Sequence, residues 1–168
     1  GILSKIIEGK VYVLGDNIDT DQIIPAKHLV FSMRDPVERL NYGKYALSGL
    51  PSDLYKIPFV SLGDKSEYNV IIGGKNFGCG SSREQAPAAL KFSGVQVVLA
   101  PSYARIFYRN VIDAAFLTPL ELKNRNVGEF STGDFVTVDM EKCVVVCPRT
   151  GKSLAFHPLG EAQHILDA

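Results

Sequence analysis

The chain has 168 residues, 46% of them hydrophobic, which is enough for one domain with a substantial core because domains typically contain ~100 to 200 residues. Its 18 lysines and arginines balance 18 aspartates and glutamates, so overall charge favours neither nucleic acid nor an anionic membrane surface as a partner. The longest apolar runs, at residues 95–101 and 144–147, are far shorter than the ~20 residues of a membrane-spanning helix. We therefore expect a protein that uses neither nucleic acid nor membrane.

An early strand is predicted at residues 10–14, followed by a polar loop at residues 15–21 that is rich in turn-forming residues. Prolines and glycines then interrupt the chain repeatedly as far as Pro58. This pattern indicates a long mobile excursion at about residues 26–58.

The middle of the chain repeats the order strand, loop, helix, which predicts a parallel sheet. The expected strands are at residues 68–72, 95–100 and 117–120, and the expected helices at 83–92 and 102–114, the second of them capped by Ser102. After residue 129 the sequence pattern changes to that of short strands, at residues 134–140, 142–146 and 153–156, which predicts an antiparallel part. A short helix is expected at residues 158–166.

The three cysteines, Cys79, Cys143 and Cys147, cannot all pair within the chain, which indicates a reducing compartment and no disulfide. Cys143 and Cys147 lie in an apolar run, where packing is expected over metal binding because buried free cysteine behaves as a small hydrophobe. The three histidines are dispersed at positions 28, 157 and 164. We therefore expect no metal site formed by this chain alone.

The most informative stretch is the glycine-rich segment at residues 73–84. Glycines allow backbone to approach a ligand, and the start of the following helix offers unpaired amide hydrogens to an anion. Ser81, Ser82 and Arg83 add two hydroxyls and a bidentate cation at the same place, which favours a small polycarboxylate over a nucleotide. The endings typical of nucleotide-binding loops are absent from the sequence.

Structural roles compete with this interpretation. The spacing of Ser81 and Glu84 matches the capping box of an ordinary helix start, and either Ser81 or Ser82 could cap while the other faces a cleft. For the aspartates at positions 16, 19 and 21, capping within the loop is favoured over catalysis. Arg105 and Arg109, four residues apart, are typical of a solvated or salt-bridged helical stripe and less often of a subunit-contact patch.

Three separated blocks carry a resemblance to a known family. They are residues 15–25 (GDNIDTDQIIP), residues 78–84 (GCGSSRE), and residues 102–107 (SYARIF) followed by Asn110. Together they resemble the small subunits of isopropylmalate isomerases (3-isopropylmalate dehydratases), which are homologous to the C-terminal swivelling domain of aconitase. The resemblance extends over residues 10–166.

This resemblance implies an α/β fold of three layers, with a mainly parallel sheet and additional antiparallel strands. It implies one swivelling domain over residues 1–168, with residues 26–58 as a mobile substrate-recognition excursion. The implied reaction is the interconversion of 2-isopropylmalate and 3-isopropylmalate by dehydration and rehydration in leucine biosynthesis. The implied partner is a large subunit, in a heterodimer or heterotetramer, that holds a four-iron four-sulfur cluster. This chain alone would then be inactive, in the cytoplasm or the plastid stroma.

The resemblance also implies roles for individual residues. Ser81 matches the base that removes the carbon-bound proton, and Asp21 matches an active-site carboxylate of a proton relay or loop. Arg83 would bind a substrate carboxylate, with Ser82 assisting. Serine of ordinary acidity is a poor base, so Ser81 would need the helix start, backbone amides and Arg83 to stabilise its anion.

Substrate choice is implied by the segment after Pro25. Homoaconitase-type relatives carry an arginine at the position of Val30, and an apolar Val30 beside Phe31 fits an isopropyl group, because a buried carboxylate without a cation is costly. His28 and Gln85 depart from the common tyrosine and histidine of the family. These departures keep a related longer-chain alkylmalate open as the substrate. The alternative function is therefore that of a small subunit for a related alkylmalate or homoaconitate hydro-lyase.

Two other classes of function use the same loop. A hydrolase or transferase would employ Ser81 or Cys79 as a nucleophile, although no histidine partner is evident in the sequence. A non-catalytic module would bind carboxylate through Arg83 without chemistry.

Overall fold

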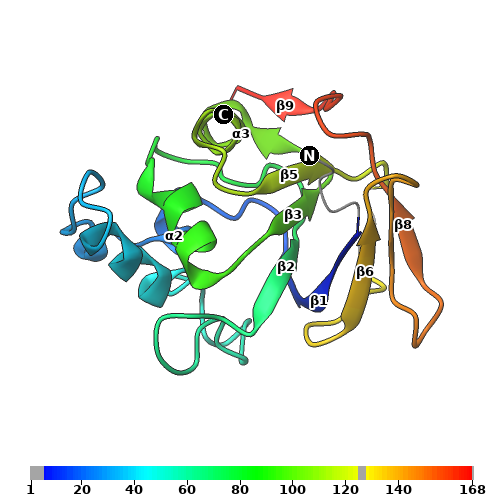
Figure 1. Cartoon of the computed structure of the whole chain (residues 1–168), viewed down its shortest axis with the longest axis horizontal. Coiled ribbons are helices and arrows are strands. Elements are labelled where there is room, and N and C mark those ends of the chain that lie inside the picture. Colours follow the sequence, from blue (N-terminus) through cyan, green and yellow to red (C-terminus); the bar gives the residue numbers. More distant parts are fainter. Residues whose placement is uncertain (1–5, 125–127, 168) are drawn as a thin grey trace.

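A seven-stranded sheet forms the centre of the chain in the computed structural model, which describes residues 6–124 and 128–167 (Figure 1). Its strands, in the order in which they lie side by side, are β5 (Thr118–Glu121), β3 (Val97–Ala100), β2 (Tyr68–Ile72), β1 (Ile6–Val13), β6 (Phe135–Asp139), β7 (Val144–Val146) and β8 (Ser153–Ala155). A separate pair joins β4 (Tyr103–Ala104) to β9 (Ile165–Leu166).

The sheet has a parallel half and an antiparallel half. Strands β5, β3, β2 and β1 run parallel, as the repeated strand and helix order predicted, and β1, β6, β7 and β8 pair antiparallel. Because side chains alternate along a strand, each central strand contributes to two cores. Val11 and Val70 belong to one apolar cluster, whereas Tyr12 and Ile71 belong to the other.

Helices cover one face of the parallel half. They are α1 (Thr20–Ile23), α2 (Gln85–Ser93) and α3 (Arg105–Ala114), together with the 3-10 helices η1 (Ala26–His28) and η2 (Glu38–Tyr45). The small side chains of α2, including the buried Ala86 and Ala89, allow the helix to pack closely on the sheet and on η2 (Figure 1). Phe107 and Val111 of α3 enter the same core.

The antiparallel half curls over the opposite face. Val136, Val145 and Leu154 pack there against Val70 and Val97 of the parallel half. A bridge between Leu122 and Phe156 brings the two edges of the sheet together. Helices, parallel strands and antiparallel strands thus form three layers, and the predicted fold class is confirmed. None of the helices within the described ranges is long and apolar enough to span a membrane.

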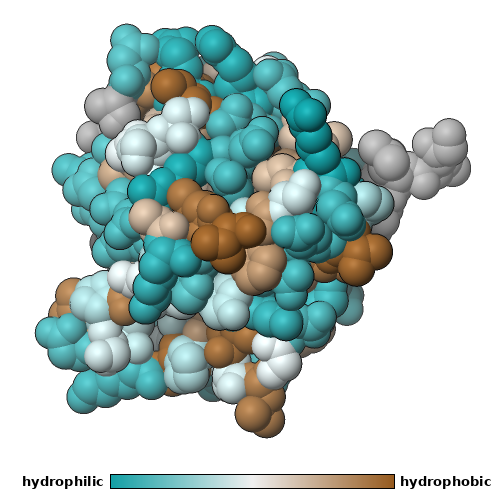
Figure 2. All heavy atoms as spheres, turned by 90° about the vertical axis from the view of Figure 1, so that its left-hand side faces the viewer, coloured by the Kyte–Doolittle hydropathy of each residue, from teal (hydrophilic) through white to brown (hydrophobic). Residues whose placement is uncertain are grey.

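Residues 26–58 project on the side of η2 as short 3-10 helices and turns (Figure 1). Tyr42 is buried beneath them, and its hydroxyl accepts from Phe31 N at 3.1 Å and donates to Phe31 O. Several large apolar side chains nevertheless face outward here, and Figure 2 shows apolar patches among polar side chains on this side of the molecule: Val30, Val37, Leu40, Leu54 and Ile57. The mobility of this segment stays a prediction.

Two local predictions were wrong. The chain forms no helix at residues 158–166, because Glu121 accepts hydrogen bonds from the backbone N–H groups of Gln163 and His164 and the following residues pair as β9. Ser102 does not cap α3, which begins at Arg105. Its hydroxyl instead accepts from Asn76 N at 2.7 Å and ties the glycine-rich loop to the next strand.

Candidate active site

The first two sequence blocks, which residues 26–77 separate along the chain, meet at the carboxyl ends of β1 and β2. Gly78 N donates to Ile18 O at 2.7 Å, and Thr20 N donates to Cys79 O at 2.9 Å. The Thr20 hydroxyl donates to Ser81 O, also at 2.7 Å. These bonds hold the backbone before Arg83 against α1.

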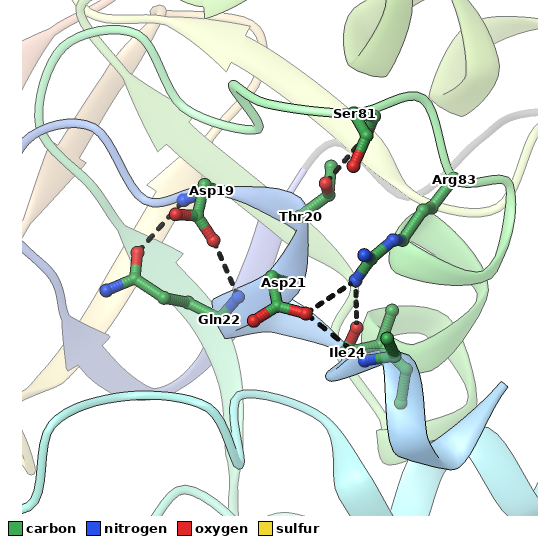
Figure 3. A network of polar contacts seen from close by, with 8 residues as sticks. Asp19, Thr20, Asp21, Gln22, Ile24, Ser81 and Arg83 are labelled. Atoms are coloured by element: carbon green, nitrogen blue, oxygen red, sulfur yellow. Dashed lines mark hydrogen bonds and ion pairs between the residues drawn. The ribbon is translucent and has the colours of Figure 1, made fainter.

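A reciprocal capping box builds α1. Asp19 Oδ1 accepts from Gln22 N at 2.7 Å, and Gln22 Oε1 accepts from Asp19 N at 3.0 Å (Figure 3). Asp16 Oδ1 accepts from Lys75 N at 2.8 Å and joins the polar loop to the glycine-rich loop. The predicted structural role is confirmed for Asp16 and Asp19.

Asp21 points in another direction, toward Arg83 (Figure 3). Arg83 Nη1 donates to Asp21 Oδ1 and to Ile24 O, each at 2.9 Å, and Asp21 Oδ1 also accepts from Ala26 N. The hydrogen bond from Arg83 and that from Ala26 N lower the pKa of Asp21, which keeps it a carboxylate. Nη1 makes all the contacts of Arg83 with described residues, so the two-donor edge formed by Nε and Nη2 is open.

The predicted capping box at Ser81 and Glu84 is wrong. Helix α2 begins at Gln85, and its N-cap residue Glu84 makes no side-chain cap bond. The carbonyl of Ser81 is held by Thr20, so Ser81 and Ser82 precede the first turn of the helix. Both residues are exposed, and neither hydroxyl is engaged by a described residue.

The third block completes a pocket of about 290 Å³. Phe107 of α3 packs against Phe77 with ring centroids 5.4 Å apart, which brings the start of α3 beside the glycine-rich loop. All three blocks contribute to the lining, among them Thr20 from the first, Ser81, Ser82 and Arg83 from the second, and Arg105, Phe107 and Asn110 from the third. A volume near the lower end of the ~300 to 1,000 Å³ typical of small-molecule sites suits a small acid.

Two predicted substrate residues lie outside this pocket. Val30 is 71% exposed on the projecting segment, and Phe31 packs against Tyr42 and Tyr45. Ser81, Ser82 and Arg83 therefore line one pocket, and Asp21 is in contact with Arg83. Val30 and Phe31 do not line that pocket.

Three residues near the site were missed as functional candidates. Arg105 and Asp167 line the pocket and form an ion pair at 2.6 Å, and the buried Glu121 anchors the segment that carries Asp167. Arg105 had a signal, because it lies inside a family block. Asp167 and Glu121 had none, since only the folded chain brings them near.

None of the cysteines and histidines in the described part of the chain lines the pocket. Cys143 and Cys147 pack with the core under the antiparallel strands, as predicted. Burial, followed by the nearby Asp19, raises the pKa of the Cys79 thiol. In the described part of the chain, no group of three histidine, cysteine, aspartate or glutamate side chains could hold a metal ion, and no histidine lines the pocket.

Residues 61–125, which include the glycine-rich loop and the start of α3, match the family model of the aconitase C-terminal domain. Fold, pocket and match together define the chain as an aconitase C-terminal-type domain. A relative in Arabidopsis thaliana, 3-isopropylmalate dehydratase small subunit 1, is 46% identical over 98% of this chain, which spans 66% of that relative's length. The methanogen homoaconitase small subunit of Methanocaldococcus jannaschii is 37% identical over 97% of this chain and 87% of its own length.

A crystal structure of 3-isopropylmalate dehydratase from Methanocaldococcus jannaschii is 35% identical, with a TM-score of 0.73 over 93% of this chain and 84% of that one. The chain belongs to the family of 3-isopropylmalate dehydratase small subunits.

Proposed function

We propose that this chain is the small subunit of a 3-isopropylmalate dehydratase. With a large iron-sulfur subunit, in a heterodimer or heterotetramer, it interconverts 2-isopropylmalate and 3-isopropylmalate in leucine biosynthesis, and alone it is inactive. The observation that carries this proposal is the pocket in which two free serine hydroxyls and an open guanidinium edge face the same space. Its compartment is a reducing one, cytoplasm or plastid stroma.

Arg83 is suited to bind a carboxylate of the substrate. Its Nη1 is fixed by Asp21 and Ile24, and its side chain is only 17% exposed. A guanidinium held on one side presents Nε and Nη2 in a fixed plane that matches the two oxygens of a carboxylate. Asp21 therefore orients Arg83 and does not itself contact the reacting carbon of the substrate.

Ser81 takes the proton from carbon and returns it on rehydration. Ser81 lies two residues before Arg83 and lines the same pocket, so the cation can stabilise the alkoxide that proton transfer requires. Ser82 lines the same pocket and adds a hydrogen-bond donor for the substrate.

The iron-sulfur cluster is assigned to the partner subunit. The residues described here do not fit it, because Cys79 is the one cysteine beside the site and the other two lie in the core. The outward apolar side chains of the projecting segment, among them Val37 and Leu54, each 74% exposed, suit contact with that partner. In an assembled complex the same contact would bring Val30 toward the shared site.

Anaerobic mixing of this chain with a candidate iron-sulfur subunit tests the proposal. Turnover of 3-isopropylmalate, followed through the ultraviolet absorbance of the unsaturated intermediate, is expected only when both chains are present. Turnover by either chain alone, or none with a cluster-loaded partner, would remove the assignment.

Arg83→Lys is expected to impair turnover strongly although it keeps the charge. Lysine is a point charge without the planar two-donor edge, and it also loses the fixed contacts with Asp21 and Ile24. We expect kcat/KM to fall about tenfold or more, the equivalent of one charged hydrogen bond. Arg109→Lys, on the exposed surface of α3 and outside the pocket, is the matched control and should leave kinetics unchanged. Unchanged kinetics of the Arg83 variant would make Arg83 structural.

Val30→Arg is expected to weaken use of isopropylmalate and to raise use of a homoaconitate-like substrate with an added carboxylate. Arginine would set a charge beside the isopropyl group and offer two donors to a distal carboxylate. Competition between the two substrates in the complex measures the change. Leu62→Arg, at an apolar residue that is 87% exposed and lies outside residues 26–58, is the control and should leave the preference ratio unchanged. An unchanged preference ratio for the Val30 variant would show that Val30 does not line the assembled site.

A further inference from the structure

A second arginine opens onto the same pocket as Arg83. Arg105, the first residue of α3, lines it, and Arg105 Nε donates to Asp167 Oδ1 at 2.6 Å. Nη1 and Nη2 of Arg105 have no partner among the described residues. Its terminal two-donor edge is therefore open, as one edge of Arg83 is.

The carboxylate that pairs with Arg105 belongs to Asp167, whose side chain is 88% exposed. Asp167 directly follows β9, which pairs in parallel with β4 immediately before α3. Tyr103 N donates to His164 O at 3.1 Å. Strand pairing thus places Asp167 beside Arg105.

Glu121 anchors this segment from the end of β5. Its carboxylate is fully buried, and Oε1 accepts from Gln163 N at 3.0 Å and from His164 N. Oε2 lies 3.2 Å from His157 Nε2 and 3.3 Å from His164 Nδ1. These contacts of the buried Glu121 carboxylate stabilise the segment that forms this wall of the pocket, because breaking them would leave a buried charge unpaired.

We propose that Arg105 is a second substrate-binding residue of this pocket, which takes one carboxylate of a dicarboxylate while Arg83 takes the other. The inference rests on the proposed function, and it deepens it by naming the group that selects a diacid. Each guanidinium is already paired on one side, Arg83 with Asp21 and Arg105 with Asp167, so the empty pocket carries little net charge. Two open donor edges then match two carboxylates.

The test uses Arg105→Met in the complex with the large subunit. KM for isopropylmalate is expected to rise about tenfold or more, as loss of a charged hydrogen bond predicts, with an unchanged melting temperature because the side chain is half-exposed. Arg109→Met removes the same group one turn further along α3, outside the pocket, and should leave KM unchanged.

Succinate and butyrate, which have the same number of carbons but two and one carboxylates, separate the two arginines. Calorimetric titration of the complex is expected to show tighter binding of succinate than of butyrate. Arg105→Met should remove most of that difference and leave butyrate binding unchanged.

Equal binding of the two acids by the unaltered complex, or a succinate affinity and KM untouched by Arg105→Met, would overturn the inference. Failure of the proposed function is a separate outcome, because it would appear as absent turnover in the unaltered complex. The calorimetric comparison reports on Arg105 in either case.

Discussion

Ser81→Ala is expected to abolish turnover of the reconstituted complex while the chain stays folded. The substitution removes one exposed hydroxyl that no described residue engages, so the native contacts lose almost nothing. General acid-base groups contribute roughly 10² to 10⁴-fold to rate, and a loss of at least that size is expected in kcat. The backbone carbonyl that Thr20 holds is unaffected by the change.

The capping alternative makes a different prediction for this variant. Loss of an N-cap costs ~1 kcal/mol of stability and leaves catalysis intact. Since Glu84 occupies the N-cap position of α2, no lowered melting temperature is expected. Ser82→Ala is the matched control, with an identical chemical change one residue away and a smaller loss of turnover. Near-normal turnover by Ser81→Ala would remove Ser81 from the mechanism.

The sequence predicted the elements whose signals are local. Alternating strand and helix patterns located the parallel half, and turn signals after residue 129 located the antiparallel strands. The three blocks predicted a site because glycine, hydroxyl and guanidinium groups occurred together. Their convergence in one pocket depends on parallel strands ending at the same edge, which the predicted fold already contained.

Contacts between residues far apart along the chain could not be predicted from local sequence patterns. Residues 158–166 have the composition of a short helix. Two of their backbone N–H groups nevertheless donate hydrogen bonds to Glu121, which lies more than 40 residues earlier. The Ser81 and Glu84 spacing fits a capping box, but the bond from Thr20 to the Ser81 carbonyl holds the serines ahead of the helix. Tertiary hydrogen bonds outweighed local preference in both places.

Val30 shows a different limit. Its position in the motif after Pro25 implied a role in the site, whereas in this chain the side chain faces outward. A residue that meets its ligand only in an assembly carries no local signal of where it will lie. A role of Val30 in the substrate site therefore stays a prediction that requires the assembled complex, whereas the orientation of Arg83 is fixed within the chain.

Gly78→Ala is expected to destabilise the chain by roughly 2 to 6 kcal/mol and to disrupt the pocket. Gly78 has φ of +84°, which costs an L-residue about 1 to 3 kcal/mol. An added Cβ would also lie 2.2 Å from Cγ of Phe107, which is only 3% exposed and packs against Phe77. Forcing a methyl group into such packing typically costs a further ~1 to 3 kcal/mol.

Gly133→Ala separates these two costs. Gly133 has φ of +98°, but apart from its two chain neighbours no heavy atom of the described residues lies within 4 Å of the added Cβ, so this variant carries the backbone strain alone. Urea denaturation of both variants gives their free energies of unfolding, provided that the slopes match. A larger loss for Gly78→Ala than for Gly133→Ala measures the overlap with Phe107, which sets the distance between the glycine-rich loop and α3. Equal losses in the free energy of unfolding would mean that Phe107 moves aside without cost. The contact between Gly78 and Phe107 would then not determine the shape of the pocket.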